Sequence, residues 1–92
     1  MSFGRKLMRK PTFSPEAWED FLEWAETDVK VMRKILSLID AAAHTPFDGI
    51  GKPEALKHNL KGYWSRRITK EHRLVYKVTD EEILIAECKN HY

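Results

Sequence analysis

Five side chains in the second half of this 92-residue chain have the types and the sequence surroundings that phosphate chemistry requires. They are Glu54, Lys57, Arg67, Arg73 and His91. Cleavage of RNA without a metal needs a base for the ribose 2′-OH proton, an acid for the departing 5′ oxygen, and cations that stabilise the charged phosphorane. Glu54 is the only acidic residue between Gly49 and Lys70, so its carboxylate belongs to a strongly basic stretch. This set of residue types fits a metal-free RNA-cleaving site.

Glu54 and His91 also have purely structural interpretations. A loop glutamate among cations commonly forms a salt bridge, which by itself would account for Glu54. His91 lies one residue from the end of the sequence, where chains are usually poorly ordered. From the residues alone, the prediction is therefore a basic surface suited to an RNA ligand, with nuclease activity as one interpretation and simple binding as another.

Several other kinds of site are not supported by the motifs. None of the four histidines is paired with another at i, i+4 around a glutamate, and no carboxylates have ligand spacing, so we expect no metal site. No glycine-rich loop leads into a helix with a lysine, so nucleotide triphosphate binding is unsupported. Ser65 follows Gly62 but lacks the second glycine of a nucleophile elbow. The single cysteine, Cys88, excludes an intramolecular disulfide and a cysteine-based zinc cluster. We therefore expect no cofactor.

The net charge of +2 hides a strong segregation of charge along the chain. Residues 1–10 sum to +4, residues 11–51 to −5, residues 52–77 to +6 and residues 78–92 to −3. One strongly basic block is typical of a surface that binds a polyanion, although a solvated lysine-rich surface gives the same count.

The composition is that of one soluble globular domain spanning residues 1–92, with 42% hydrophobic and 33% charged residues. No stretch approaches the ~20 consecutive apolar residues of a membrane helix. The basic N-terminus has no apolar run behind it and is not a secretory signal. We expect a cytoplasmic protein.

Two helices are predicted before the basic block. Ser14-Pro15-Glu16 indicates a helix start, with a hydroxyl N-cap, a proline at the first position and an early acid. The apolar stripe predicted to face the core consists of Trp18, Phe21, Leu22 and Ala25. Trp24 falls outside this stripe, and we expect it to be available to a partner.

Thr27-Asp28 indicates the start of a second helix, which His44-Thr45-Pro46 ends because a residue before proline avoids the helical conformation. The predicted core face of this helix consists of Val29, Met32, Leu36, Ile39 and Ala43, flanked by Ile35 and Ala42. So short a connection predicts an αα-hairpin.

Three strands are predicted after a glycine- and proline-rich loop at 47–53, at residues 63–68, 74–78 and 83–86. Their short connections make them antiparallel neighbours. Residues 9–13 can add an edge strand, because Pro11 is tolerated only at an edge. The order of elements predicts an α+β fold, with the two helices packed on one face of a mainly antiparallel sheet of four to five strands.

The alternation of side chains along these strands gathers part of the basic block on one surface. Ser65 and Arg67 lie on the face opposite to Arg66, and Arg73 shares a face with Lys77. This arrangement favours an anion site on the sheet.

The motifs that follow the second helix closely resemble those of the YoeB/Txe toxins of the RelE superfamily. The matching runs are TPFDGI at 45–50, GKPEALKHNL at 51–60, GYWSRRI at 62–68, EHRLVY at 71–76 and the final HY at 91–92. They occur together in this order in that family, and the likeness extends from about Trp18 to Tyr92. Since the family usually starts about seven residues later, Met8 is a candidate initiator and residues 1–7 a candidate extension of the domain.

The resemblance implies a RelE-like microbial RNase fold and the toxin of a bacterial type II toxin–antitoxin system, which cuts mRNA in the ribosomal A site and inhibits translation. By the same resemblance, Glu54 is the general base, His91 the general acid and Arg73 the main stabiliser of phosphate charge. Lys57 and Arg67 are the supporting cations. Tyr92 is the terminal aromatic residue that helps to place RNA or the acid.

The resemblance also implies partners. A YefM-like antitoxin covers the site with its C-terminal segment, the toxin forms a homodimer, and operator DNA is bound only by the toxin–antitoxin complex. Two alternatives remain: a binder of ribosomal RNA that blocks translation without cutting, and a ParE-like autorepressor or gyrase-directed relative. Glu54 and His91, which a pure binder does not need, argue against the first, and the set of Glu54, Arg73 and His91 argues against the second.

Overall fold

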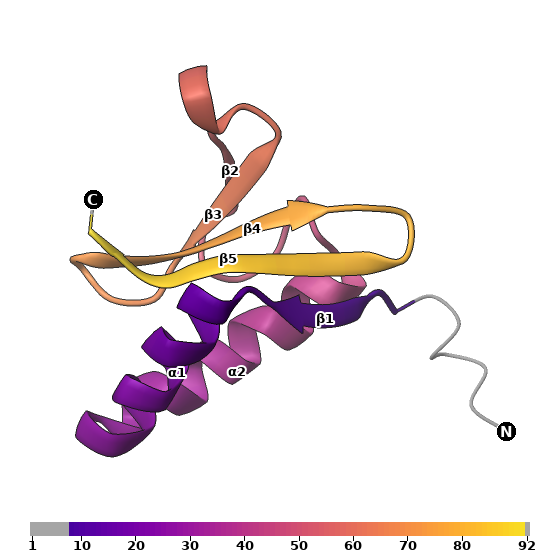
Figure 1. Cartoon of the computed structure of the whole chain (residues 1–92). Coiled ribbons are helices and arrows are strands. Elements are labelled where there is room, and N and C mark those ends of the chain that lie inside the picture. Colours follow the sequence, from indigo (N-terminus) through magenta and orange to yellow (C-terminus); the bar gives the residue numbers. More distant parts are fainter. Residues whose placement is uncertain (1–7, 92) are drawn as a thin grey trace, which may run out of the picture.

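The computed structural model describes residues 8–91, with the side chains of residues 8–89 (Figure 1). Tyr92 and the candidate extension 1–7 lie outside the described residues, as does the side chain of His91. The elements follow in the order β1 (Lys10–Phe13), α1 (Pro15–Thr27), α2 (Val29–His44), β2 (Glu54–Ala55), a 3₁₀ turn (His58–Leu60), β3 (Tyr63–Arg67), β4 (His72–Val78) and β5 (Glu82–His91).

The five strands form one mixed sheet in the order β1-β5-β4-β3-β2. Strand β1 runs parallel to β5, whereas all the other neighbours are antiparallel. Figure 1 shows α1 and α2 lying together on the same side of the sheet. The predicted α+β fold is therefore confirmed, and the strand that contains Pro11 lies at the edge of the sheet, as expected.

The two helices begin and end where their capping residues predict. The Ser14 hydroxyl accepts a hydrogen bond from the Ala17 amide at 3.0 Å, with Pro15 in the first turn. Asp28 ends α1, where its backbone amide donates to the Trp24 carbonyl at 2.7 Å. It also starts α2, because its carboxylate accepts a hydrogen bond from the Val31 amide at 3.3 Å. A single residue thus separates the helices and forms the tight αα-hairpin.

The buried side of α1 was predicted only in part: Phe21 and Ala25 are partly buried, and Phe21 packs against the core. Trp18 and Leu22 are 48% and 44% exposed, whereas Trp24 is buried at 9% and Ala17 is fully buried. The Trp24 indole N–H donates to the Cys88 carbonyl oxygen at 2.8 Å, and the ring packs edge-on against His72. Trp24 is therefore a core residue and is not available to a partner. Helix α1 packs closely on β5 through the small Ala17 and through Trp24, whose polar N–H needs an acceptor.

The core face of α2 was predicted in part. Ile35, Ile39, Ala42 and Ala43 are buried as expected, but Leu36 and Val29 are exposed at 47% and 45%. Leu38, which the prediction did not include, is fully buried. The buried arc is thus rotated from the predicted one toward Leu38, which lies close to the loop at Gly51.

The strand register confirms the predicted faces of β3 and β4. Ser65 pairs with Val75, and Arg67 pairs with Arg73, so these four side chains share the sheet face that we call the outer face. Arg66 pairs with Leu74 on the opposite face, toward the helices.

Neither of the two described α-helices has the length and apolar character that a membrane span requires.

Candidate functional site

Glu54 and Arg73 are in contact at the outer face. Glu54 enters β2 opposite Ser65 of β3, and its Oε1 lies 3.4 Å from Nη1 of Arg73 on β4. The same Nη1 donates to the Ser65 hydroxyl at 3.1 Å. The Arg73 side chain is only 6% exposed, whereas that of Glu54 is 55% exposed. A held guanidinium thus faces a carboxylate that solvent or a substrate can reach.

Arg67 lies directly opposite Arg73 across the β3–β4 ladder and is exposed. Like charges at directly opposed positions are unfavourable unless an anion or a carboxylate compensates them. Guanidinium groups bind phosphate oxygens well because their N–H donors are planar and can act in pairs. The two arginines therefore form a cationic surface next to Glu54 that suits a phosphate group.

Lys57 is exposed just before the 3₁₀ turn and follows Glu54 by three residues. The turn is held by a hydrogen bond from the Leu60 amide to the Lys57 carbonyl at 3.1 Å. Just before it, the Leu56 amide donates to the Tyr63 carbonyl at 2.9 Å. The backbone around Lys57 is therefore held by these hydrogen bonds, and its side chain is exposed two residues after the end of β2.

The backbone up to His91 belongs to the sheet rather than to a free tail. Strand β5 extends to His91, with Asn90 opposite Arg73 and His91 opposite His72. The backbone of His91 is thus aligned with the strand that carries Arg73. Because the side chain of His91 and all of Tyr92 lie outside the described residues, their roles stay predictions.

Two residues had roles that the sequence interpretation did not identify. Ser65 was considered only as a nucleophile, yet its hydroxyl, buried with the residue at 1% exposure, accepts from Arg73. Arg66 was counted in the basic block but is fully buried, so its charge is absent from the surface. Its position on the apolar side of the alternating pattern was the one available signal of that burial.

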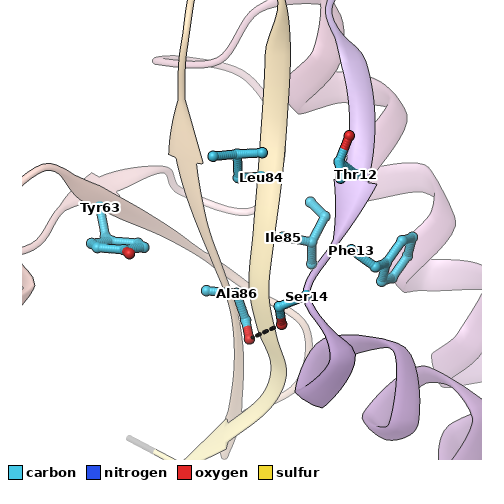
Figure 2. A pocket seen from close by; sticks show the side chains of 7 residues that line it. All are labelled: Thr12, Phe13, Ser14, Tyr63, Leu84, Ile85 and Ala86. Atoms are coloured by element: carbon cyan, nitrogen blue, oxygen red, sulfur yellow. Dashed lines mark hydrogen bonds between the residues drawn. The ribbon is translucent and has the colours of Figure 1, made fainter.

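A hollow of about 270 Å³ is lined mainly by β1 and β5, with Tyr63 of β3, and by none of the charged site residues (Figure 2). Within it the Ser14 hydroxyl donates to the Ala86 carbonyl oxygen at 2.9 Å. Tyr63 pairs with Lys77, which pairs with Leu84, so the hollow continues the outer face toward β1.

Among the described residues, no group of three or more His, Cys, Asp or Glu side chains could hold a metal ion.

The site is an accessible carboxylate beside arginines on one face of a small α+β sheet. Comparisons with known proteins show the family and the fold to which this chain is similar. The model of the YoeB-like toxin of bacterial type II toxin–antitoxin systems matches residues 13–92. The toxin YoeB of Escherichia coli K12 is 59% identical over 83 residues, which cover 90% of this chain and 99% of that protein. The toxin YoeB of Streptomyces coelicolor is 53% identical over 81 residues, covering 88% and 96%.

The solved structures agree. The YoeB dimer from Staphylococcus aureus superimposes with a TM-score of 0.86 at 50% identity, covering 92% of this chain and 99% of that one. A heterotetrameric YoeB–YefM toxin–antitoxin complex from the same organism gives a TM-score of 0.84 at 50% identity, covering 91% and 98%. Escherichia coli YafQ, at 19% identity and a TM-score of 0.68 over 89% and 92%, shares the fold alone.

The fold and these matches define a RelE-like toxin of a type II toxin–antitoxin system. Within that class, the chain belongs to the YoeB-like toxin family. The resemblance predicted from the motifs between residues 45 and 76 is thereby confirmed.

Proposed function

We propose that this toxin is a metal-independent endoribonuclease that cuts mRNA in the ribosomal A site and so stops translation. The observation that carries the proposal is the 3.4 Å contact between Glu54 and the buried Arg73. A general base and a phosphate-stabilising cation must act on neighbouring atoms, the 2′ oxygen and the phosphorus of one linkage. A carboxylate and a guanidinium held together on a basic face meet that requirement.

In the proposed reaction, Glu54 takes the proton of the ribose 2′-OH, and the 2′ oxygen forms a bond to the adjacent phosphorus. The bond between phosphorus and the 5′ oxygen breaks, and the departing oxygen receives a proton from His91. The products are a 2′,3′-cyclic phosphate and a 5′-OH. Arg73 stabilises the charge on the phosphorane, supported by Lys57 and Arg67, and Tyr92 helps to place the RNA or the acid.

The ribosome has a defined part in this proposal. A carboxylate is a weak base toward a sugar hydroxyl, so much of the rate must come from orientation of the reacting groups. The ribosome supplies this by presenting the A-site codon to the outer face in a fixed geometry. Rapid cleavage of free RNA would argue against this part of the proposal.

The partners follow from the relatives. By analogy with the Staphylococcus aureus proteins, we expect a homodimer and a YefM-like antitoxin whose C-terminal segment covers the Glu54–Arg73 site. Operator DNA is expected to bind only the complex of toxin and antitoxin. We further propose that residues 1–92 form one domain, with 1–7 as an extension, and that it acts in the cytoplasm with the ribosomes.

The test is cleavage of mRNA on programmed ribosomes, with RNA ends mapped in the presence of a transition-metal chelator that leaves the ribosomes intact. Cutting within the A-site codon is expected for the native protein and should be lost in Glu54→Ala and His91→Ala. Glu71→Ala removes an exposed acid from the β3–β4 turn and is the matched control, which should cut normally.

This assay, together with a DNA gyrase supercoiling assay, separates the alternatives. Ribosomes stalled on intact mRNA, equally for the native protein and both site variants, would indicate a translation inhibitor that only binds. Normal translation with inhibited DNA gyrase would indicate a ParE-like activity. Either result would overturn the proposed nuclease.

A further inference from the structure

Arg66 is a fully buried cation in β3, the strand that separates Glu54 from Arg73. Its side chain leaves β3 on the helix side, opposite Leu74, while its neighbours Ser65 and Arg67 face outward. Burying a charge is costly unless hydrogen bonds compensate it. The hydrogen-bond acceptors around Arg66 therefore indicate which part of the structure this buried charge stabilises.

Four of the five guanidinium N–H donors of Arg66 have acceptors. Nε donates to the Tyr76 hydroxyl at 3.0 Å, and Nη1 donates to the Ile50 carbonyl at 2.9 Å. Nη2 donates to the carbonyls of Thr45 and Asp48 at 2.6 and 2.8 Å. Three of the four acceptors are thus backbone carbonyls of a single segment, residues 45–50.

This segment follows directly from the C-terminal end of α2, where Thr45 is the capping residue. Carbonyl groups at a helix C-terminus lack intrahelical donors and carry partial negative charge, so a cation stabilises them. Tyr76 strengthens the arrangement, because its hydroxyl accepts from Arg66 and donates to the Pro46 carbonyl at 2.7 Å. Burial raises the pKa of Tyr76, although the Arg66 hydrogen bond opposes the shift, so the phenol keeps its donor proton.

The segment held by Arg66 leads through Gly51 to Glu54, the residue proposed as the base. Gly51 has a φ of +85°, and a Cβ there would lie 2.7 Å from Leu38 Cδ2 and 3.1 Å from the Arg66 Cβ. Its carbonyl accepts from the Arg67 amide at 2.7 Å. Glu54 follows three residues later, in a strand of only two exposed residues that has little packing of its own.

We infer that Arg66 is a positioning residue whose buried guanidinium fixes segment 45–51 and thereby holds the Glu54 carboxylate against Arg73. Arginine suits this role because its donors lie in one rigid plane and serve several acceptors at once, whereas lysine has a single ammonium group on a flexible chain. The catalytic meaning of the inference rests on the proposed nuclease function. The structural meaning, that Arg66 orders the chain leading to Glu54, does not.

The kinetic test separates chemistry from binding. Single-turnover cleavage is measured on mRNA-programmed ribosomes at saturating toxin, and affinity is measured with a 2′-deoxy A-site codon that cannot be cut. We expect Arg66→Met to lower the cleavage rate constant about 100-fold, the size of effect that a 1 Å misplacement produces. Affinity should stay within about threefold, because Arg67 and Arg73 remain on the outer face.

Three further variants keep the test decisive where Arg66→Met folds poorly. Tyr76→Phe removes one acceptor of Arg66 and should lower the cleavage rate constant about tenfold. Arg66→Lys should not restore the activity that Arg66→Met loses, although it keeps the positive charge. Ile83→Ala, in the core of β5, is a control that destabilises the protein away from segment 45–51. All variants are assayed well below their melting temperatures. A native rate constant for Arg66→Met and Tyr76→Phe, or an equal loss in Ile83→Ala, would overturn the inference.

Amide hydrogen exchange gives a readout that does not depend on cleavage. The Arg67 amide donates to the Gly51 carbonyl, and the Leu56 amide donates to the Tyr63 carbonyl. In Arg66→Met and Tyr76→Phe, both amides should exchange at least about tenfold faster than in the native protein. Amides shared by β4 and β5 should change far less. If the native protein cuts no RNA, the proposed function fails, and uniform exchange changes would then overturn the positioning role separately.

Discussion

The carboxylate of Glu54 lies 3.4 Å from Nη1 of Arg73, although the two residues belong to strands that are not neighbours in the sheet. Strand β3 lies between them, and its Ser65 hydroxyl accepts from the same Nη1. The guanidinium is therefore buried and held at two points, while the carboxylate stays accessible. This combination distinguishes the pair from an ordinary surface salt bridge, which contributes little and is loosely held.

Replacing Arg73 with lysine should separate charge from geometry. Arg73→Lys keeps the positive charge but loses the planar donors that reach Ser65 and Glu54, so the single-turnover rate constant should fall about 100-fold. Affinity for uncleavable mRNA on ribosomes should change by less than about threefold. The exposed Arg33→Lys on α2 is the control for the same substitution elsewhere. Full activity of Arg73→Lys would mean that charge alone suffices.

Removing Arg67 should weaken RNA binding without harming the fold. Arg67 is exposed and opposes another arginine, so its loss removes a repulsion and should leave the free energy of unfolding unchanged or slightly higher. For a short single-stranded RNA, the slope of log K against log[salt] should shrink by about 0.7, the value for one phosphate contact.

Urea denaturation and salt titrations of Arg67→Ala test both parts of this prediction. Lys70→Ala, an exposed cation in the turn after β3, serves as the comparison. An identical salt slope in the native protein and in Arg67→Ala would show that Arg67 does not contact phosphate.

The Cys88 thiol should make the fold sensitive to alkaline pH. Burial, and secondarily the nearby Asp20 carboxylate, raise the pKa of Cys88 from its ordinary value of 9.0 to about 12. The unfolded chain loses this proton first, so the contribution of the neutral thiol is complete below pH 9 and is lost as pH rises toward 12. In Cys88→Ala, the free energy of unfolding should decline less steeply at alkaline pH. Tyr76, whose pKa is also raised, should contribute to the decline that is left.

Denaturant unfolding between pH 8 and pH 11 measures this decline. Native Cys88 should also resist iodoacetamide at pH 8 and react only after unfolding, because the thiolate is the reactive form. Rapid alkylation of the folded protein would contradict the buried, protonated thiol.

Trp24 should contribute to stability through its indole N–H as well as its area. Trp24→Phe keeps an aromatic ring but leaves the Cys88 carbonyl without this donor, so the free energy of unfolding should fall by about 1–3 kcal/mol. Thermal and urea unfolding measure the change. Trp18→Phe, at an exposed position in the first turn of α1, is the matched control and should lose much less. An equal loss in both variants would argue against the hydrogen bond as the cause.

Much of the architecture was determined by local sequence signals. Ser14 and Asp28 mark the helix starts because a side-chain oxygen there satisfies free amides, an effect that needs no distant contact. Period-2 alternation placed Arg67 and Arg73 on one face and Arg66 on the other, because the pleat of a strand leaves no other choice. The motifs from residue 45 to residue 76 were sufficient to identify the family.

Other features were decided only by tertiary structure. Apolar spacing located a stripe on α1, but the side of the helix that is most buried lies beside it: packing buried Ala17 and Trp24, which are outside the stripe, and left Trp18 and Leu22 exposed. The parallel pairing of β1 with β5, and the meeting of Glu54, Ser65 and Arg73, join residues far apart in the chain. Arg66 counts as one more positive charge in the sequence, and only the folded chain brings three carbonyls and a phenol around it. Local patterns reflect backbone geometry, whereas the environment of a charge depends on which distant groups the fold brings to it.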